Sequence, residues 1–331
     1  MLAKGDELRG FLERLRDEKK KIRFSQLYAL SDLTREQLAE FVAVWESVST
    51  VRRRRLIQAL VELAEASFQV NFDAIFRHCL EDPDDEVRAM AIDGLWENEE
   101  FSLIGPLLTM LRTDPSPRVR AAAASGLGRY VLAGQLERLE EPIQARIISD
   151  LLTTIHTAEE SVLVRRRAIE SVSYADSAEV IEALEIAYED EDEGMRLSAV
   201  AGMGRSCDMR WKDILLHELG NRSPAMRYEA AWACGELGLR QAVPILGRLL
   251  NDRDRQVREA SIWALGQIGG PEAKQLLLAA YEDADEETQE ALDEALAEQA
   301  LAEGTLDFLL YDFEEDGEEE EYWSDWDEEL E

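Results

Sequence analysis

The 331-residue chain is poor in the residues that build disulfide bonds and metal sites. It has three cysteines and three histidines, which are Cys79, Cys207, Cys234, His78, His156 and His217. The cysteines are too few and too dispersed for a disulfide framework. No spacing of His and Cys residues matches a zinc site. The sequence therefore predicts a reduced protein with no metal and no other cofactor.

Long hydrophobic runs are absent as well. No segment approaches the roughly 18 consecutive apolar residues that a membrane helix needs. The first ten residues, MLAKGDELRG, contain acidic groups where a signal peptide has an apolar stretch. We therefore expect a cytoplasmic protein that does not bind membranes.

Positive charge is scarce, and the end of the chain lacks it entirely. The 71 acidic residues outnumber the 36 basic residues, so the formal net charge is −35. Lys274 is the last basic residue, and the 57 residues after it hold 24 of the acidic groups. Nucleic-acid phosphates attract clustered lysine and arginine, so a nucleic-acid partner is not expected. Apolar residues make up 46 % of the chain, enough for a large core, so disorder of the whole chain is excluded.

A ten-residue pattern, Val-Arg-x-x-Ala-x-x-(Ala/Gly)-Leu-Gly, recurs along the chain, for example as VRAAAASGLG from Val119 and VREASIWALG from Val257. Its second position serves as an anchor in each copy. The anchors are Arg53, Arg88, Arg120, Arg165, Arg196, Arg227, Arg258 and Gln289. Successive anchors lie 35, 32, 45, 31, 31, 31 and 31 residues apart. The regular spacing indicates tandem repeats, and the spacing of 45 indicates inserted residues around 133–142.

Each copy is predicted to form the second helix of a helix-turn-helix pair. The residue four positions before each anchor is a good N-cap for that helix, and an amphipathic run lies upstream of the turn. These caps are Asp84, Ser116, Ser161, Asp192, Ser223, Asp254 and Asp285. Eight pairs are expected, over residues 34–67, 71–99, 101–131, 142–174, 177–207, 209–239, 241–268 and 271–300.

One helix pair cannot bury its apolar face alone, whereas stacked pairs can. The predicted fold is therefore all-α, an α-solenoid of about eight helix pairs. We expect three segments: an N-terminal capping helix in residues 1–33, the solenoid in 34–302, and an acidic tail with aromatic residues in 303–331. The composition of the tail predicts that it is disordered.

The repeat resembles the HEAT family, in the short form of phycobilisome-lyase HEAT-like repeats. The resemblance covers nearly all of residues 34–300 and is carried by the acidic turn and the Val-Arg-x-x-Ala second helix. It implies a scaffold for protein–protein interactions. Two alternatives remain open. One is a phycobilin-lyase-like role in chromophore attachment or as a chaperone subunit, and the other is a DNA-glycosylase-like fold, which needs a basic groove.

No catalytic motif accompanies the repeats. The sequence has no phosphate-binding loop, no dinucleotide fingerprint and no nucleophile elbow. A non-enzymatic protein is expected. Thirty of the 36 basic residues are arginine, which favours fixed, bidentate ion pairs. We expect the anchor arginines to pair with the acidic residues that lie six positions before most anchors, within or between turns.

The second helices normally line the concave side of a HEAT array. On each of them, the positions one, five, eight and nine residues after the anchor lie opposite the apolar stripe. Aromatic residues and arginine are enriched in interface hot spots. The partner-binding candidates on this face are Arg129, Arg166, Tyr174, Arg205, Tyr228, Trp232 and Trp263. For the two tryptophans, packing over the glycines at the eighth position is the alternative.

The tail is a second candidate for partner binding. Residues 303–331 hold fifteen acidic groups, no basic residue and six aromatic side chains, among them Trp323 and Trp326. Acidic segments with aromatic residues can fold onto a partner, so a protein with a basic surface is the expected partner. In the alternative, the tail acts as a gate that covers the concave face of its own chain through Arg129, Arg166 and Arg205.

Overall fold

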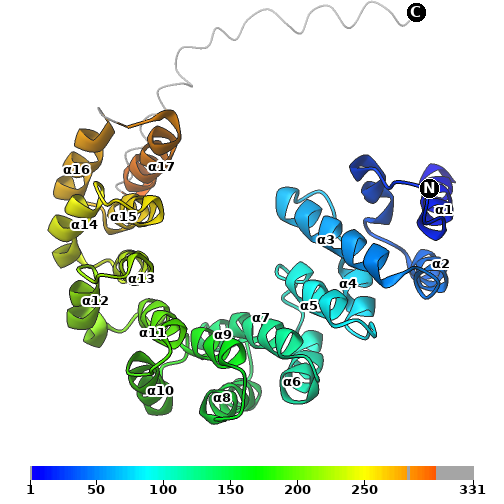
Figure 1. The fold of residues 1–331 in the computed structure, drawn as a ribbon, viewed down its shortest axis with the longest axis horizontal. Helices are drawn as coiled ribbons and strands as arrows, with labels where there is room; N and C mark the ends of the chain where they lie inside the picture. The colour runs from blue at the N-terminus through cyan, green and yellow to red at the C-terminus, as the bar shows by residue number, and fades with distance from the viewer. Residues whose placement is uncertain (1, 282–283, 303–331) are drawn as a thin grey trace, which may run out of the picture. The chain divides into compact units, whose positions relative to one another are not determined.

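The computed structural model describes residues 2–281 and 284–302, in which all regular secondary structure is helical (Figure 1). The chain forms two compact units, Met1–Ser206 and Cys207–Glu331. In both units, first helices neighbour first helices and second helices neighbour second helices, which gives two layers. The predicted all-α solenoid is confirmed.

Unit 1 begins with α1 (Leu2–Arg16) and the 3₁₀ helix η1 (Phe24–Leu30), which pack against each other, and α1 also packs against α2. Five helix pairs follow. They are α2 (Arg35–Trp45) with α3 (Thr50–Ala66), α4 (Asp73–Cys79) with α5 (Asp85–Gly94), α6 (Ile104–Thr113) with α7 (Pro117–Gln135), α8 (Glu141–His156) with α9 (Val162–Val172), and α10 (Ala178–Tyr188) with α11 (Glu193–Arg205).

Unit 2 contains the remaining three pairs. They are α12 (Lys212–Glu218) with α13 (Pro224–Glu236), α14 (Val243–Leu249) with α15 (Arg255–Ile268), and α16 (Pro271–Tyr281) with α17 (Glu286–Ala302). Short 3₁₀ helices, η3 (Met209–Trp211) and η4 (Arg240–Ala242), lead into α12 and α14. All eight predicted pairs are thus present.

The second helices begin where the sequence predicts. The carboxylates of Asp84 and Asp192 each accept a hydrogen bond from the backbone N–H three residues on, and Asp254 accepts from both Gln256 and Val257. These bonds satisfy amide groups that the first turn of a helix leaves without partners. A side-chain cap therefore marks the start of α5, α11 and α15, whereas Ser116 and Ser161 stand at the N-cap position of α7 and α9 without a side-chain cap bond.

The insertion does not form a separate loop. The extra residues lengthen the third pair's second helix and the fourth pair's first helix: α7 has 19 residues and α8 has 16, whereas α5 has 10 and α10 has 11. The connection between α7 and α8 consists of residues 136–140. Half of the segment in which the sequence places the insertion is therefore helical, and the other half connects the two helices.

The anchor arginines join consecutive repeats. The guanidinium of Arg88 binds both carboxylate oxygens of Asp114 in the next repeat, at 2.9 Å each, and also donates to the carbonyl oxygen of Asp82 in its own turn. Arg227 binds Asp252 and the carbonyl oxygen of Asn221 in the same way. The Arg227 hydrogen bond holds the pKa of Asp252 below its usual range. The predicted pairing is confirmed between turns for Arg53, Arg88, Arg165 and Arg227. Arg196 and Arg258 donate to carbonyl oxygens of their own turns.

One partner differs from the expected position. Arg120 forms a bidentate pair with Glu160, whereas the sixth residue before the next anchor is Glu159. The turn of the fourth repeat carries two adjacent glutamates, Glu159 and Glu160, and Arg120 binds the second of them. We call the series of ion pairs between an anchor arginine and the next turn the ladder. Its spacing rule is wrong by one residue at this repeat.

Candidate docking site

Three aromatic side chains meet on the second-helix layer of unit 2. The ring centroids of Trp232 on α13 and Trp263 on α15 lie 3.7 Å apart, with an interplanar angle of 33°. Tyr228 lies one turn before Trp232, at 6.3 Å between centroids. All three are half-buried, so part of each ring faces solvent. We call Tyr228, Trp232 and Trp263 the aromatic shelf.

The shelf depends on a glycine in α13. A Cβ atom at Gly235 would lie 2.5 Å from Cζ3 of Trp263 and 2.9 Å from Cα of Ala264, so the absence of a side chain lets α15 and the Trp263 ring approach. Trp263 thus packs over the glycine at the eighth position, as the alternative interpretation states. Trp263 is nevertheless only half-buried, and it lines a neighbouring groove.

A groove of about 470 Å³ runs beside the shelf. Buried Ala260, Ile262 and Ala295 contribute apolar surface. Three carboxylates line it, those of Glu259, Glu294 and Glu298. Glu259 pairs with Arg255 of its own helix, whereas Glu294 and Glu298 are exposed and form no ion pair with any residue that the structure describes. None of the residues that line the groove is basic.

A buried polar atom lies in the same place. The indole Nε1–H of Trp232 is buried, and it has no hydrogen-bond acceptor among the described residues. A buried donor without an acceptor is rare in folded proteins because it loses its bond to water without a replacement. Trp232 is therefore the shelf residue with an unmet hydrogen bond.

The unit 1 candidates make contacts within the protein. Arg129 donates to the carbonyl oxygens of Leu95 (2.7 Å) and Trp96 (2.9 Å), at the C-terminal end of α5. Arg129 therefore closes the end of the neighbouring second helix, where carbonyl groups lack intrahelical donors.

Arg166 and Arg205 belong to one network centred on Glu170. Arg166 Nε donates to Ser198 Oγ (3.0 Å), and Ser198 Oγ donates to Glu170 Oε1 (2.6 Å). Arg205 donates to the carbonyl oxygen of Glu170 (3.2 Å). Tyr174 is half-buried in the turn after α9. These bonds join α9 to α11, so the three arginines are engaged inside unit 1. Trp323 and Trp326, with the rest of the tail, lie outside the described residues.

Sequence reasoning missed two sets of residues. The carboxylates beside the shelf come partly from α17, and only the fold brings Glu294 and Glu298 to the tryptophans. A second groove, in unit 1, is lined by basic residues from 19–23 and from α3. Three consecutive lysines, 19–21, were a visible signal for it, because half of the chain's six lysines stand there.

The remaining groups with potential chemistry are isolated. All three cysteines are free, and burial raises the pKa of the Cys79 and Cys234 thiols, that of Cys234 to about 12. The described residues contain no cluster of three or more His, Cys, Asp or Glu side chains suited to a metal ion. Among the same residues, no helix combines the length and the apolar character needed to span a bilayer.

Comparison with known proteins identifies the repeat. A sequence model of the HEAT-repeat family matches residues 73–145 and 212–297, which places one matched stretch in each unit. No curated protein sequence matches the chain.

Several solved structures are similar in fold alone. Yeast importin-beta is 12 % identical, with a TM-score of 0.47, over 89 % of this chain and 46 % of importin-beta. The Escherichia coli protein YibA is 16 % identical, with a TM-score of 0.43, over 73 % of this chain and 96 % of YibA. Human deoxyhypusine hydroxylase is 19 % identical, with a TM-score of 0.33, over 90 % and 97 % of the two chains. The chain contains HEAT repeats in residues 73–145 and 212–297, and the resemblance inferred from its repeated motif is confirmed there.

Proposed function

We propose that this protein is a non-enzymatic scaffold that binds a partner protein on the second-helix face of unit 2. The observation that carries the proposal is the aromatic shelf, which includes a closely packed, half-buried tryptophan pair beside a groove. Tryptophan and tyrosine are over-represented among the residues that dominate binding energy. Because the candidate arginines Arg129, Arg166 and Arg205 have internal partners, the proposal rests on the aromatic shelf. The cytoplasmic location stays a prediction.

The chemistry of the groove favours a basic segment of the partner. A lysine or arginine side chain can lie over an indole face and gain a cation–π interaction. Its charge would then be close to Glu294 and Glu298, which have no cation of their own among the described residues. The net charge of −35 would accelerate the encounter with such a partner.

The proposal is tested with a fluorescein-labelled peptide of alternating arginine and serine, titrated with the full chain at low salt. We expect Trp232→Ala to weaken binding by roughly 30-fold, which corresponds to about 2 kcal/mol for a hot-spot residue. Fluorescence anisotropy gives the affinity, and circular dichroism shows whether each variant remains folded.

Trp96→Ala is the matched control, because Trp96 is 48 % exposed in unit 1, far along the chain from the shelf. The control should bind as the unchanged protein does. Equal affinity of folded Trp232→Ala and of the unchanged protein would show that the shelf is a packing feature only.

A further inference from the structure

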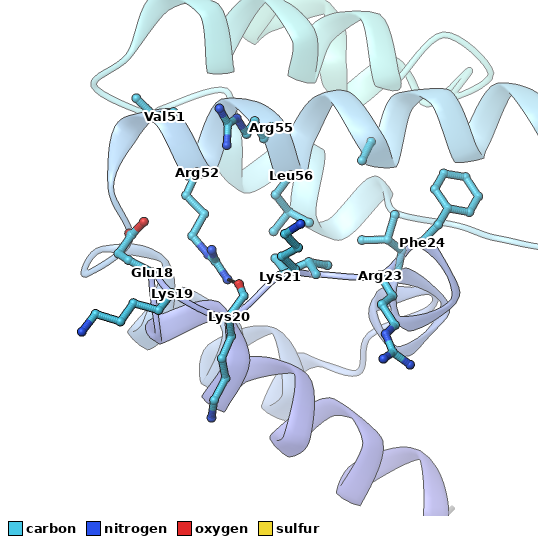
Figure 2. Close-up of a pocket in the computed structure, with 13 residues that line it drawn as sticks. Glu18, Lys19, Lys20, Lys21, Arg23, Phe24, Val51, Arg52, Arg55 and Leu56 are labelled. Atoms are coloured by element: carbon cyan, nitrogen blue, oxygen red, sulfur yellow. Dashed lines mark hydrogen bonds between the residues drawn. The ribbon is translucent and has the colours of Figure 1, made fainter.

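The N-terminal region of unit 1 contains a groove of about 690 Å³ (Figure 2). One wall is the segment between α1 and η1, and the other is the first half of α3, which carries Val51, Arg52, Arg55 and Leu56. The groove is lined by Glu18, Lys19, Lys20, Lys21, Ile22, Arg23, Phe24, Leu27, Val51, Arg52, Arg55, Leu56 and Ala59. Six of these residues are cations and one is an anion.

Internal hydrogen bonds hold the walls in place. Arg52 reaches across the groove, and its Nη2 donates to the carbonyl oxygens of Arg14 (2.9 Å) and Lys20 (2.8 Å). The carboxylate of Glu18 accepts from the backbone N–H of Ser49 (3.2 Å). These bonds engage the one anion and one of the cations in structural roles. The groove is therefore a built feature of unit 1.

The other cations remain available. Lys21, Arg23 and Arg55 are exposed and form no ion pair with any described residue. Lys20 is 3.8 Å from Asp17, at an exposed site where such a pair contributes little. A concentration of free cations is unusual on a chain with a net charge of −35, and it will attract a negatively charged group.

The groove also offers apolar contacts. Leu27 and Leu56 are buried beneath it, whereas Phe24 is 53 % exposed and Val51 is 60 % exposed. Phosphate groups gain nothing from such a surface, and the chain's charge opposes the approach of a nucleic acid. A ligand that carries both carboxylates and aromatic rings would use both kinds of contact.

We propose that this groove is the docking site for residues 303–331 of this protein. That segment combines fifteen carboxyl groups with six aromatic side chains and has no cation that would compete for them. The aromatic residues are Phe308, Tyr311, Phe313, Tyr322, Trp323 and Trp326. Because the segment is part of the same polypeptide, every molecule that presents the groove also supplies its ligand.

The chain allows a direct test, since it has only six lysines. A carbodiimide joins a lysine amine to a carboxylate in contact with it, so the full chain is cross-linked and digested, and the linked peptides are identified by mass spectrometry. We expect residues 303–331 to be linked mainly to Lys19, Lys20 or Lys21. Links mainly to Lys4, Lys212 or Lys274, or none, would overturn the proposal.

Two variants test whether the groove itself is responsible. Arg55→Glu leaves all lysines in place and should reduce these links at least fivefold. Arg146→Glu makes the same charge change at an exposed position of α8 and should leave their yield unchanged. An equal loss in both variants would mean a general charge effect, and no loss in either would mean contact outside the groove. Both results contradict the proposal.

Competition experiments test which ligand occupies the basic groove. Free peptide 303–331 should suppress the links, whereas a peptide with the same carboxylates and with serine at the six aromatic positions should be at least fivefold weaker. Equal suppression by the two peptides would reduce the site to a nonspecific cation patch. Stronger suppression by a single-stranded RNA oligonucleotide than by the native peptide would make it a phosphate site. Either outcome overturns the proposed occupant.

Discussion

A single buried carboxylate, that of Asp82, joins the first two helix pairs. Its Oδ2 accepts hydrogen bonds from Trp45 Nε1 on α2 (2.8 Å) and from Arg53 Nη1 on α3 (2.7 Å). The Asp82 side chain is 1 % exposed and that of Arg53 is 12 % exposed. Removal of a carboxylate from such a site leaves a buried cation and a buried indole N–H without acceptors, which is costly.

We therefore expect Asp82→Ala to lower the free energy of unfolding by about 3 kcal/mol. Urea denaturation followed by circular dichroism measures the change. Glu40→Ala is the control, because Glu40 lies 3.9 Å from Arg9 in an exposed pair, and its loss should cost less than about 1 kcal/mol. Similar losses in the two variants would show that Asp82 does not hold the repeats together.

The ladder also shows what sequence can reveal about single residues. The anchor spacing predicts which arginines pair with an acidic turn, because that depends on one repeated motif, but it leaves open whether the pair lies within a turn or between turns. It does not predict that Arg120 pairs with Glu160, or that Arg129 donates hydrogen bonds to carbonyl groups at the C-terminal end of α5. Those choices depend on which of two adjacent glutamates faces Arg120 and on where a neighbouring helix ends, which only the folded chain defines.

At the scale of helices, small residues set how closely second helices approach. The glycine eight positions after the anchor meets a small residue of the next second helix: Gly128 meets Ser171, Gly235 meets Ala264, and Gly266 meets Ala295. A Cβ at Gly235 or Gly266 would lie under 3.0 Å from an atom of the facing helix. Each glycine thus serves close helix–helix packing rather than a turn.

We predict that Gly235→Ala destabilises unit 2 by about 1–2 kcal/mol, because the cost of overpacking exceeds the gain in helix propensity. The methyl group would also displace Trp263, so tryptophan fluorescence should shift and the arginine–serine peptide should bind more weakly. Thermal denaturation and fluorescence emission measure the two effects.

Gly10→Ala is the matched substitution, since a Cβ there has no atom within 4 Å. It should stabilise α1 by about 0.5–1 kcal/mol and leave the fluorescence unchanged. A stabilising effect of Gly235→Ala would show that α15 is free to move away from α13, and that the shelf does not depend on the glycine.

The helices themselves were predictable because their signals are local. N-cap residues, apolar periodicity and the repeat spacing all lie within about 31 residues of sequence, and the eight pairs follow from them. Neither groove could be predicted in this way, because each is lined by residues that are far apart in the sequence. The groove beside the shelf needs α17 to supply Glu294 and Glu298, and the basic groove needs α3 to fold back against residues 19–23. Such sites depend on which helices become neighbours.

At the scale of the whole molecule, charge has two separate roles that salt can distinguish. The ladder pairs are shielded, since the Arg88 and Asp114 side chains are 12 % and 8 % exposed. The carboxylates of Glu294 and Glu298 beside the shelf are exposed. The Debye length falls from about 10 Å at 0.1 M salt to about 3 Å at 1 M, and exposed charges are screened more than buried ones.

We therefore predict that added salt weakens binding without lowering stability. Between 0.05 M and 0.5 M sodium chloride, the affinity for the arginine–serine peptide should fall by about tenfold or more, because screening removes the attraction of exposed carboxylates. The melting temperature should not fall over the same range, because the ladder is shielded and salt also reduces the mutual repulsion of a chain at −35. Anisotropy and calorimetry on one sample measure both. A melting temperature that falls with salt would mean that exposed ion pairs, rather than the shielded ladder and the apolar core, hold the repeats together. An affinity that does not change with salt would mean that the shelf recognises apolar rather than basic side chains.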